Sequence, residues 1–258
     1  MGRRLGQHFL NRKSTLDRIA TSACGEHTPL VIEIGAGRGA LTESLLERAD
    51  KVVAIELDPV LIHYLRQKFR DALEAGRLIL VESDILKADL SAWGPAVIAG
   101  NLPYYITSPI LERLFAAGAS WTLAVILVQA EVAARIVAEP GCRDYGYLSV
   151  LVQAQARAER LFEVPRTSFK PPPKVDSAVV ALTPRPADID NLPSFLKFAG
   201  NCFRYKRKTL RNNLAGLYDR TAVESLVGPK DRAETLGVPQ LAKLFQALTI
   251  RSAVVYPT

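Results

Sequence analysis

Between residues 30 and 182, short apolar runs alternate with longer segments that have the apolar spacing of amphipathic helices. Runs typical of strands occupy residues 30–34, 52–55, 78–81, 96–99, 123–128 and 175–182, and helical patterns occupy residues 41–49, 61–75, 110–117, 130–138 and 148–157. Alternating strands and helices predict a mostly parallel sheet with helices on both faces. The predicted fold class is therefore α/β.

Two prolines in the segment Thr183-Pro-Arg-Pro186 end this pattern, because proline donates no hydrogen bond to a strand ladder and restricts the residue before it. We expect a domain boundary here, with residues 1–186 forming the α/β domain and residues 187–258 a small, basic helical domain. Helices are expected at residues 192–203, 206–217, 221–226 and 239–248.

The formal net charge of +7 is concentrated in two short segments. Residues 3–18 carry +4 and residues 204–211 carry +5, so the rest of the chain is slightly acidic. Clustered cations favour a polyanionic partner, and phosphates are the natural counter-charge. For either segment alone, a solvated helix face remains the alternative. The candidate phosphate-binding residues are Arg3, Arg4, Arg204, Lys206, Arg207, Lys208 and Arg211.

Composition disfavours a membrane protein and a disordered chain, since 48% of the residues are hydrophobic but no apolar run is long. The longest run, near residues 123–128, is far shorter than the roughly 20 residues that span a bilayer, and no apolar signal core follows the basic N-terminus. We therefore expect a cytoplasmic protein. Cys24, Cys142 and Cys202 lie too far apart for a paired metal motif, so reduced thiols and no bound metal are expected.

A glycine-rich turn containing Gly35, Gly37 and Gly39 lies between the first predicted strand and the helix that follows. Glycine permits unusual backbone dihedral angles and leaves the amides at a helix N-terminus open to a ligand. The turn therefore predicts a cofactor site at the carboxyl end of the sheet. Gly35, Gly37 and Ala40 also match a dinucleotide fingerprint, and a purely structural turn is a further alternative.

Three acidic residues indicate which cofactor this turn would hold. Glu56 ends the second predicted strand, 21 residues after Gly35, where a carboxylate accepts hydrogen bonds from both ribose hydroxyls and repels a ribose phosphate. Asp84 follows the third strand, where it can accept a hydrogen bond from an adenine amine. Glu33 precedes the turn and suits a cofactor tail that carries an ammonium and a sulfonium. The set favours a cationic adenosyl cofactor.

The segment Gly100-Asn-Leu-Pro-Tyr-Tyr105 follows the fourth predicted strand and is the most specific local motif. The Asn101 side-chain oxygen and the Leu102 carbonyl can accept both hydrogens of an adenine exocyclic amine, which favours attack of its nitrogen on a methyl group. Pro103 fixes the turn, and Tyr104 offers a face on which an extruded base stacks. Methyl transfer to an adenine amine is the predicted reaction; an ordinary Asn-Pro-type turn is the alternative.

Several segments together form a pattern that is more specific than any one motif. They are Arg4-Leu-Gly-Gln-His-Phe-Leu10, the glycine turn with Glu56-Leu-Asp58, Gly100-Asn-Leu-Pro-Tyr104, Phe169-Lys-Pro-Pro-Pro-Lys-Val-Asp-Ser177, Arg207-Lys-Thr-Leu-Arg-Asn212 and Arg232-Ala-Glu-Thr-Leu236. Over essentially the whole chain, this pattern resembles the small-subunit ribosomal RNA adenine N6-dimethyltransferases, the KsgA family. The resemblance implies a Rossmann-like methyltransferase sheet with a small C-terminal all-helical domain.

The resemblance also implies a reaction: S-adenosyl-L-methionine (SAM)-dependent transfer of two methyl groups to each of two adjacent adenosines near the 3′ end of 16S rRNA. The cofactor residues implied by matching position are His8, Leu10, Gly35, Gly37, Glu56, Asp84 and Asn101. His8, which is asparagine in some members, and Leu10 would close over the cofactor through main-chain contacts. The implied catalytic residues are Asn101, Leu102, Pro103, Tyr104 and Phe169.

Within that catalytic group, Phe169 would stack on the flipped base opposite Tyr104. The implied partners are small-subunit rRNA, which the basic residues would bind, and the immature small subunit. Nothing in the sequence demands a dimer, so a monomer is expected.

Three other functions remain open from the sequence. A related family, which dimethylates an adenine of large-subunit rRNA and confers macrolide resistance, shares the Asn-x-Pro-Tyr turn but differs in the helical domain. The match at residues 232–236 therefore favours the small-subunit family. An NAD oxidoreductase would explain residues 35–40 but leaves the Asn101 motif unused. A non-catalytic ribosome-assembly factor would explain the basic segments but not the cofactor acids.

Overall fold

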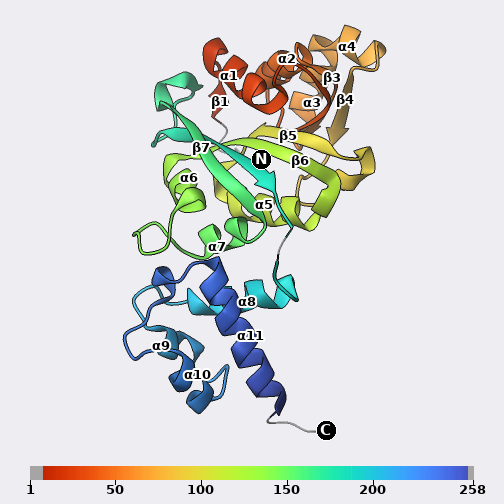
Figure 1. Ribbon diagram of the computed structural model, residues 1–258. Helices are drawn as coiled ribbons and strands as arrows, with labels where there is room; N and C mark the ends of the chain where they lie inside the picture. Colours follow the sequence, from red (N-terminus) through yellow and green to blue (C-terminus); the bar gives the residue numbers. More distant parts are fainter. Residues whose placement is uncertain (1–7, 187, 255–258) are drawn as a thin grey trace. The chain divides into compact units, whose positions relative to one another are not determined.

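The computed structural model describes residues 8–186 and 188–254, which form two compact units (Figure 1). The sheet unit comprises Met1–Ala133 and Arg157–Pro184, and the helical unit comprises Ala134–Ala156 and Arg185–Thr258. This division differs from the predicted boundary at residue 186 in that residues 134–156 group with the helical unit.

The sheet unit contains a seven-stranded sheet in the order β4-β3-β2-β5-β6-β9-β7. Its strands are β2 (Thr28–Ile34), β3 (Ala49–Glu56), β4 (Leu78–Glu82), β5 (Ala96–Asn101), β6 (Trp121–Gln129), β7 (Ala156–Val164) and β9 (Ser177–Pro184). Strands β2 to β6 run parallel, and β9 runs antiparallel to β6. The predicted α/β class is confirmed. The order of strands reverses between β2 and β5, where open α/β sheets bind their ligands.

The strands of the sheet unit alternate with helices, as the sequence pattern predicts. These are α1 (Lys13–Cys24), α2 (Ala40–Leu46), α3 (Pro59–Lys68), α4 (Arg70–Glu74), α5 (Thr107–Ala116) and the first half of α6 (Ala130–Val137), with the 3-10 helices η1 (Leu90–Trp93), η2 (Tyr104–Ile106), η3 (Gly118–Ser120) and η4 (Arg166–Ser168). The start of α3 is fixed locally, because the Asp58 side chain accepts a hydrogen bond from the Val60 N–H at 2.9 Å. Pro59 at the first turn suits the same position.

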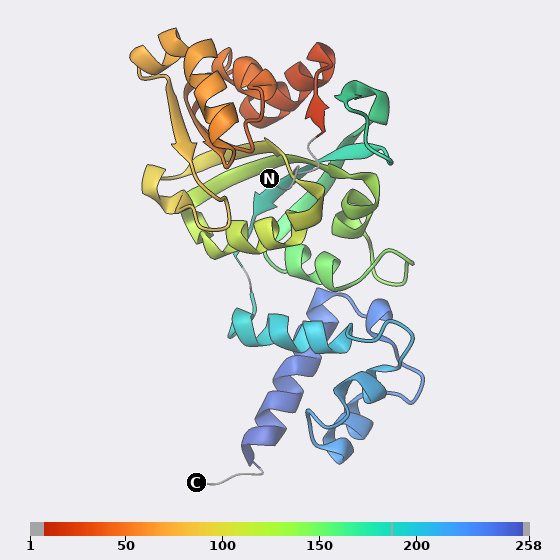
Figure 2. The ribbon, with the colours of Figure 1, turned by 180° about the vertical axis from the view of Figure 1, so that it is seen from behind.

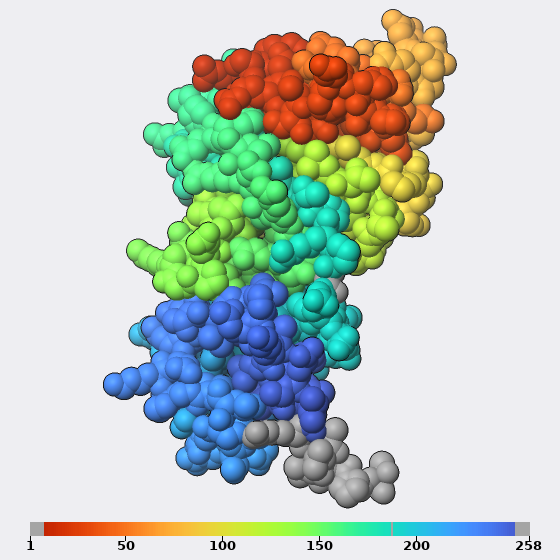
Figure 3. Space-filling view, viewed as in Figure 1, coloured from red at the N-terminus to blue at the C-terminus, as the bar shows by residue number. Residues whose placement is uncertain are grey.

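The N-terminal segment pairs with a distant part of the chain. Strand β1 (Phe9–Leu10) runs antiparallel to β8 (Phe169–Lys170), with Leu10 opposite Phe169. In the space-filling view, the red N-terminal residues border the green residues that include β7 (Figure 3). There the Arg18 guanidinium lies 3.8 Å from the centroid of the Phe162 ring. These contacts anchor the segment that leads into α1.

Strand β7 differs from the prediction, which extended a helix to residue 157 and assigned no strand between residues 158 and 174. The structure ends α7 (Tyr147–Gln153) and starts β7 at Ala156. β7 is an edge strand, and about half of its residues are exposed, so it carries charged side chains instead of a continuous apolar run. The helix expected at residues 61–75 is also divided, at Phe69, into α3 and α4.

The helical unit is built around its own apolar core. Its later helices are α8 (Leu192–Cys202), α9 (Leu210–Leu214), α10 (Arg220–Leu226), η5 (Ala233–Thr235) and α11 (Val238–Val254). α8 crosses α11 in both ribbon views (Figure 2). Phe195, Phe198 and Phe245 are buried at that crossing, with Phe198 and Phe245 ring centroids 5.5 Å apart. A unit with such a core can hold its surface loops rigidly.

The basic segment at residues 204–208 is a loop, so the prediction of a continuous helix over residues 206–217 is wrong. The buried Asn213 side chain explains this conformation. Its Nδ2 donates to the carbonyls of Cys202 and Tyr205 at 2.8 and 3.3 Å, and its Oδ1 accepts from the Tyr205 N–H at 3.1 Å. These bonds satisfy backbone groups at the end of α8 and hold the loop in a tight turn.

Among the described residues, no helix is long and apolar enough to cross a membrane. The three cysteines are unpaired; Cys24 and Cys202 are buried, whereas Cys142 is exposed. In the same residues, His, Cys, Asp and Glu side chains form no group of three or more that could hold a metal ion.

Candidate active site

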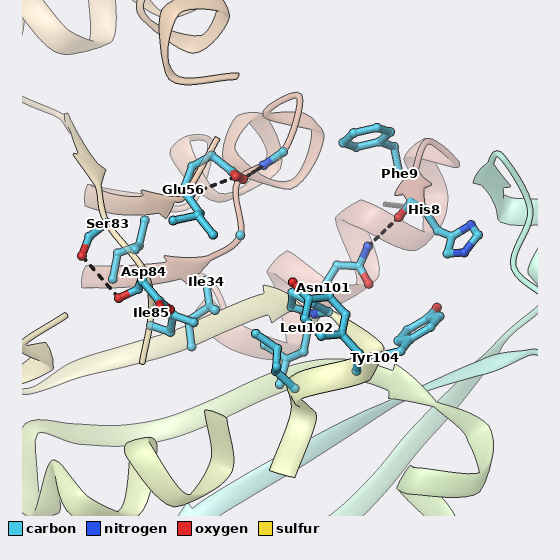
Figure 4. Close-up of a pocket in the computed structure, with 17 residues that line it drawn as sticks. His8, Phe9, Ile34, Glu56, Ser83, Asp84, Ile85, Asn101, Leu102 and Tyr104 are labelled. Carbon is cyan, nitrogen blue, oxygen red and sulfur yellow. Dashed lines mark hydrogen bonds between the residues drawn. The ribbon is translucent and has the colours of Figure 1, made fainter. Parts of the chain in front are cut away.

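A pocket opens at the carboxyl ends of β2, β3 and β5, at the reversal of strand order (Figure 4). It brings together most of the predicted site residues, namely His8, Gly35, Gly37, Glu56, Asp84, Asn101, Leu102, Pro103 and Tyr104. Leu10 and Phe169 do not line it. The pocket is also lined by Phe9, Leu57 and Tyr105, which the sequence analysis did not identify as site residues.

Glu56 is fixed at the end of β3 by backbone N–H donors. Its Oε1 accepts from Leu57 at 2.9 Å and Asp58 at 3.0 Å, and its Oε2 accepts from Gly37 at 2.8 Å. Two carboxylate oxygens provide about four lone-pair positions, so acceptor capacity remains for a ligand in the pocket. The side chain is 6% exposed and therefore has one defined orientation toward that ligand.

Gly37 links this carboxylate to the N-terminal strand. Its φ of +57° lies in the left-handed region, which favours glycine. A Cβ at this position would lie 3.2 Å from the Phe9 ring. The glycine therefore lets Phe9 lie directly on the turn, and the Arg38 guanidinium sits 5.0 Å from the centroid of the same ring. The predicted glycine turn thus has two roles: it supplies backbone amides, and it supports the wall of the pocket that Phe9 forms.

Asp84 lies beyond the end of β4, on the side of the pocket where Ser83 and Ile85 also line it. Its Oδ1 accepts from the Leu86 N–H at 3.0 Å, which holds the carboxylate in place. Figure 4 shows Asp84 and Glu56 on the same side of the pocket, with Asn101 and Tyr104 on the other. The pocket therefore has an acidic end and an amide-aromatic end.

Asn101 occupies the last position of β5 and has a defined amide orientation. Its Nδ2 donates to the His8 carbonyl oxygen at 3.1 Å (Figure 4). Among the described residues, Oδ1 has no hydrogen-bond partner, so it is free to accept from a ligand. The following Leu102 N–H donates to the Leu127 carbonyl at 3.0 Å, which ties the turn to β6. The chain thus presents an acceptor oxygen to the pocket.

Tyr104, in η2, is held at the far end of its ring. Its hydroxyl group shares a 2.7 Å hydrogen bond with Oγ of the fully buried Ser177 in β9. Burial raises the pKa of Tyr104, so the phenol is neutral at physiological pH. Ser177 ends one of the segments of the sequence motif, but no role for its hydroxyl group was predicted. It acts as a positioning residue for the ring.

Tyr104→Phe and Ser177→Ala each remove this hydrogen bond and retain the aromatic ring. We expect either variant to lower kcat for the activity of this site roughly fivefold, the value of one net hydrogen bond. The double variant should lose no more than either single variant, because both delete the same interaction. Steady-state rates at saturating cofactor measure this. Losses that multiply would contradict the positioning role.

Two predicted residues lie in the core beside the pocket. Leu10 is 5% exposed and Phe169 is 2% exposed, and they face each other across the β1–β8 pair. Pairing with β1 turns the Phe169 ring into the core, so it offers no open face to a base in this structure. The ring that lies opposite Tyr104 is that of His8. Stacking by Phe169 stays a prediction.

Glu33 does not lie where its charge suggested, and the expectation that it contacts a cationic cofactor tail is not met. Neighbouring side chains of a strand point to opposite faces, and Ile34 is the one that lines the pocket. Glu33 is 1% exposed and accepts a 2.5 Å hydrogen bond from the Thr42 hydroxyl group. Burial raises the pKa of Glu33 to about 7.

The raised pKa of Glu33 predicts a pH-dependent stability. In the unfolded chain the carboxyl ionises near 4.5, whereas in the folded protein it stays protonated up to about 7, so the free energy of unfolding falls as the pH rises through this range. Glu33→Gln has no carboxyl group to ionise, so it removes the cost of burying a charge at this position. Relative to wild type, we expect the variant to gain roughly 3 kcal/mol between pH 4 and pH 8 in urea unfolding. The exposed Glu82→Gln is the control, and equal pH slopes would refute the assignment.

Two of the N-terminal cations have contacts within the described chain. Arg3 and Arg4 lie outside the described residues. Lys13 pairs with Asp17 at 2.9 Å and Glu47 at 3.3 Å, and Arg18 lies on Phe162. Lys13 and Arg18 are therefore less available to a phosphate than their charges suggest, whereas Arg12 is exposed.

In the helical unit, the predicted cations divide into two groups. The Arg211 Nε and Nη2 donate to the carbonyls of Val227 and Glu224 at 2.8 and 3.1 Å, and Lys206 Nζ donates to the Arg143 carbonyl at 2.9 Å. The other three, Arg204, Arg207 and Lys208, are exposed and have no ion-pair partner within the described chain. These three form the exposed basic cluster.

Comparison with known proteins identifies the family. The family model for ribosomal RNA adenine dimethylase matches residues 2–249. The chain belongs to this family. It is 43% identical to the ribosomal RNA small subunit methyltransferase A of Synechococcus elongatus, over 92% of this chain and 91% of the relative. It is 40% identical to the protein of the same name from Acidobacterium capsulatum, over 96% of this chain and 92% of that relative.

Solved structures of rRNA and adenosine methyltransferases share the fold of this adenine dimethylase. A dimethyladenosine transferase from Plasmodium falciparum superposes with a TM-score of 0.81 at 27% identity, covering 95% of this chain and 98% of its own. The 23S rRNA methyltransferase ErmE superposes with a TM-score of 0.72 at 30% identity, covering 93% of this chain and 99% of its own. Both matches extend over the sheet unit and the helical unit of this chain.

The pocket of this adenine dimethylase fits SAM, the family's cofactor. The fixed Glu56 carboxylate can accept from ribose hydroxyls, and Asp84 can accept from an adenine amine. Ile34, Ile55 and Ile85 give the apolar lining that an adenosyl group requires. The polar groups that line the pocket include carboxylates and the Asn101 amide, and no Lys or Arg side chain for a pyrophosphate is among the lining residues. This distribution disfavours the dinucleotide alternative.

Proposed function

We propose that this chain is a SAM-dependent methyltransferase that dimethylates the N6 amines of two adjacent adenosines near the 3′ end of 16S rRNA. The observation that carries the proposal is the Asn101 amide. Its nitrogen is held by the His8 carbonyl, and its oxygen faces the pocket without a protein partner in the described residues. The family and the relatives named for the small subunit support the same reaction.

The chemistry divides between the cofactor and the chain. When bound, SAM would supply an electrophilic methyl group on a sulfonium; the adenine nitrogen would take this group in place of sulfur and lose its proton to water. Asn101 Oδ1 accepts one amine hydrogen and thereby raises electron density on the nitrogen. Leu102 follows in the same turn and lines the pocket, so its carbonyl is the proposed acceptor for the second hydrogen.

Tyr104 orients the base. Its ring lies at the same end of the pocket as Asn101 and is held by Ser177, so a flipped adenine that stacks on it brings its amine toward the amide. Orientation of this kind contributes to the rate because the reacting atoms meet in the geometry of the transition state. No general base is required for an amine that loses its proton after transfer.

The small subunit is the proposed substrate, and the large subunit is the competing one. A relative named for the small subunit is 43% identical to this chain, whereas the 23S rRNA methyltransferase ErmE is 30% identical. The exposed basic cluster would contact rRNA phosphates. We further propose that the enzyme acts in the cytoplasm as a monomer, on immature subunits whose 3′ end is accessible.

Methyl transfer to purified subunits tests this proposal. Small and large subunits that lack these methyl groups are incubated separately with the enzyme and labelled SAM. We expect label in 16S rRNA and none in 23S rRNA. Label confined to 23S rRNA would reject the substrate assignment. If neither rRNA is labelled, and NAD but not SAM raises the melting temperature, the proposed reaction class is wrong.

A further inference from the structure

Two aromatic rings from distant parts of the chain face each other at the amide-aromatic end of the pocket. The centroids of the His8 and Tyr104 rings are 6.1 Å apart, and the ring planes differ by only 22°. Both residues line the pocket, and Figure 4 shows the two rings beside Asn101. The imidazole is therefore placed where a stacked base would have its second neighbour.

Each ring is held from outside the pair. The His8 Nδ1–H donates to the Pro171 carbonyl at 2.8 Å, and the His8 backbone carbonyl accepts from Asn101. Tyr104 is held by Ser177. Neither ring depends on the other for its position, so a flat group entering between them would leave both sets of anchors in place with only a small adjustment.

A flat group can lie between the two rings only if they move apart. Two successive face contacts of about 3.5 Å require about 7 Å between the outer rings. The ring centroids are 6.1 Å apart, which lies within the range of about 4.5 to 7 Å for a stacked aromatic pair, so the rings must separate before a base can lie between them. Movement of the partly exposed His8 side chain would open this space for a purine.

We propose that the His8 imidazole forms the second wall of the target-base slot, so that the adenine stacks between His8 and Tyr104 with its amine toward Asn101. This inference rests on the proposed function and assigns a role to the side chain of His8, where a main-chain role toward the cofactor was expected. It also gives the slot a second aromatic face while the ring of Phe169 is buried.

Three variants test the slot in the full-length enzyme with methyl-deficient small subunits and saturating SAM. His8→Ala removes the ring, and His8→Phe restores a flat ring without the Nδ1–H donor. His63→Ala removes an exposed imidazole of α3, which does not line the pocket. The readouts are kcat/KM for the subunit and the Kd for SAM, measured by calorimetry.

We expect His8→Ala to lower kcat/KM for the subunit roughly tenfold, within the range of base–aromatic stacking. His8→Phe should recover most of this loss, the Kd for SAM should stay within about twofold in both variants, and His63→Ala should match wild type. Equal losses in His8→Ala and His8→Phe would overturn the slot in favour of a purely structural hydrogen bond.

Other outcomes also exclude the slot. An increase of kcat/KM in His8→Ala would show that the imidazole obstructs the site, and unchanged kcat/KM would show that it has no role in base binding. A loss that follows weaker SAM binding would assign His8 to the cofactor instead. If wild type itself transfers no methyl group to the small subunit, the proposed function fails and this inference fails with it.

Discussion

Asn101→Ala is expected to lower the methyl-transfer rate constant by roughly 10³-fold or more, while SAM affinity stays within a few-fold of wild type. The side chain has one hydrogen-bond acceptor that the described protein leaves free, and the reaction develops positive charge on the amine that this acceptor would face. The polar contacts proposed for the cofactor come from Glu56 and Asp84, which the variant does not change. Single-turnover transfer and calorimetric SAM binding measure the two effects separately.

Asn101→Asp is the matched variant. It retains an acceptor oxygen but has no donor for the His8 carbonyl, so we expect a rate between those of wild type and Asn101→Ala. Near-normal transfer by Asn101→Ala would show that the amine is activated elsewhere. A loss explained entirely by weaker SAM binding would assign Asn101 to the cofactor alone.

Simultaneous replacement of Arg204, Arg207 and Lys208 by Gln is expected to weaken small-subunit binding by roughly tenfold or more and to flatten its salt dependence. These side chains are exposed, and the Arg204 guanidinium lies 5.2 Å from the ring of Tyr205, which is itself 53% exposed. Cations beside an open aromatic face suit an RNA backbone with unpaired bases. The slope of log Kd against log salt should fall by up to about 2 to 3.

Arg211→Gln is the contrasting control. Its guanidinium bonds two backbone carbonyls of α10 and the residue after it, so this variant should lower the melting temperature more than it alters the salt slope. An unchanged slope in the triple variant would show that the exposed basic cluster is only a solvated loop. Transfer to a short rRNA fragment by the triple variant should survive, because the pocket is intact.

Local sequence signals predicted the features that depend on chain order and backbone chemistry. The strands and glycine turn placed Glu56 and Asp84 at one edge of the sheet because parallel strands end there together. The Asn101 to Tyr104 turn was located by its proline and its place after a buried strand. Each of these residues lines the pocket.

Other features depend on contacts between distant segments, which no local pattern reveals. The orientation of Phe169 follows from its pairing with Leu10, and the loop at residues 204–208 follows from bonds to Asn213. Successive side chains of a strand point to opposite faces, and Ile34 faces the pocket, so Glu33 points away from it. This orientation of Glu33 could have been anticipated from the sequence. The contact of His8 with Tyr104 joins the N-terminal segment to η2. No spacing of residues in the sequence indicates that these two rings meet.

The most direct test of the central claim is nucleoside mass spectrometry on the 3′-terminal fragment of 16S rRNA from methyl-deficient small subunits treated with enzyme and SAM. The account predicts two N6,N6-dimethyladenosines per fragment with wild type and none with Asn101→Ala. Methyl groups at another base or ring position, or the same product from Asn101→Ala at an undiminished rate, would contradict it.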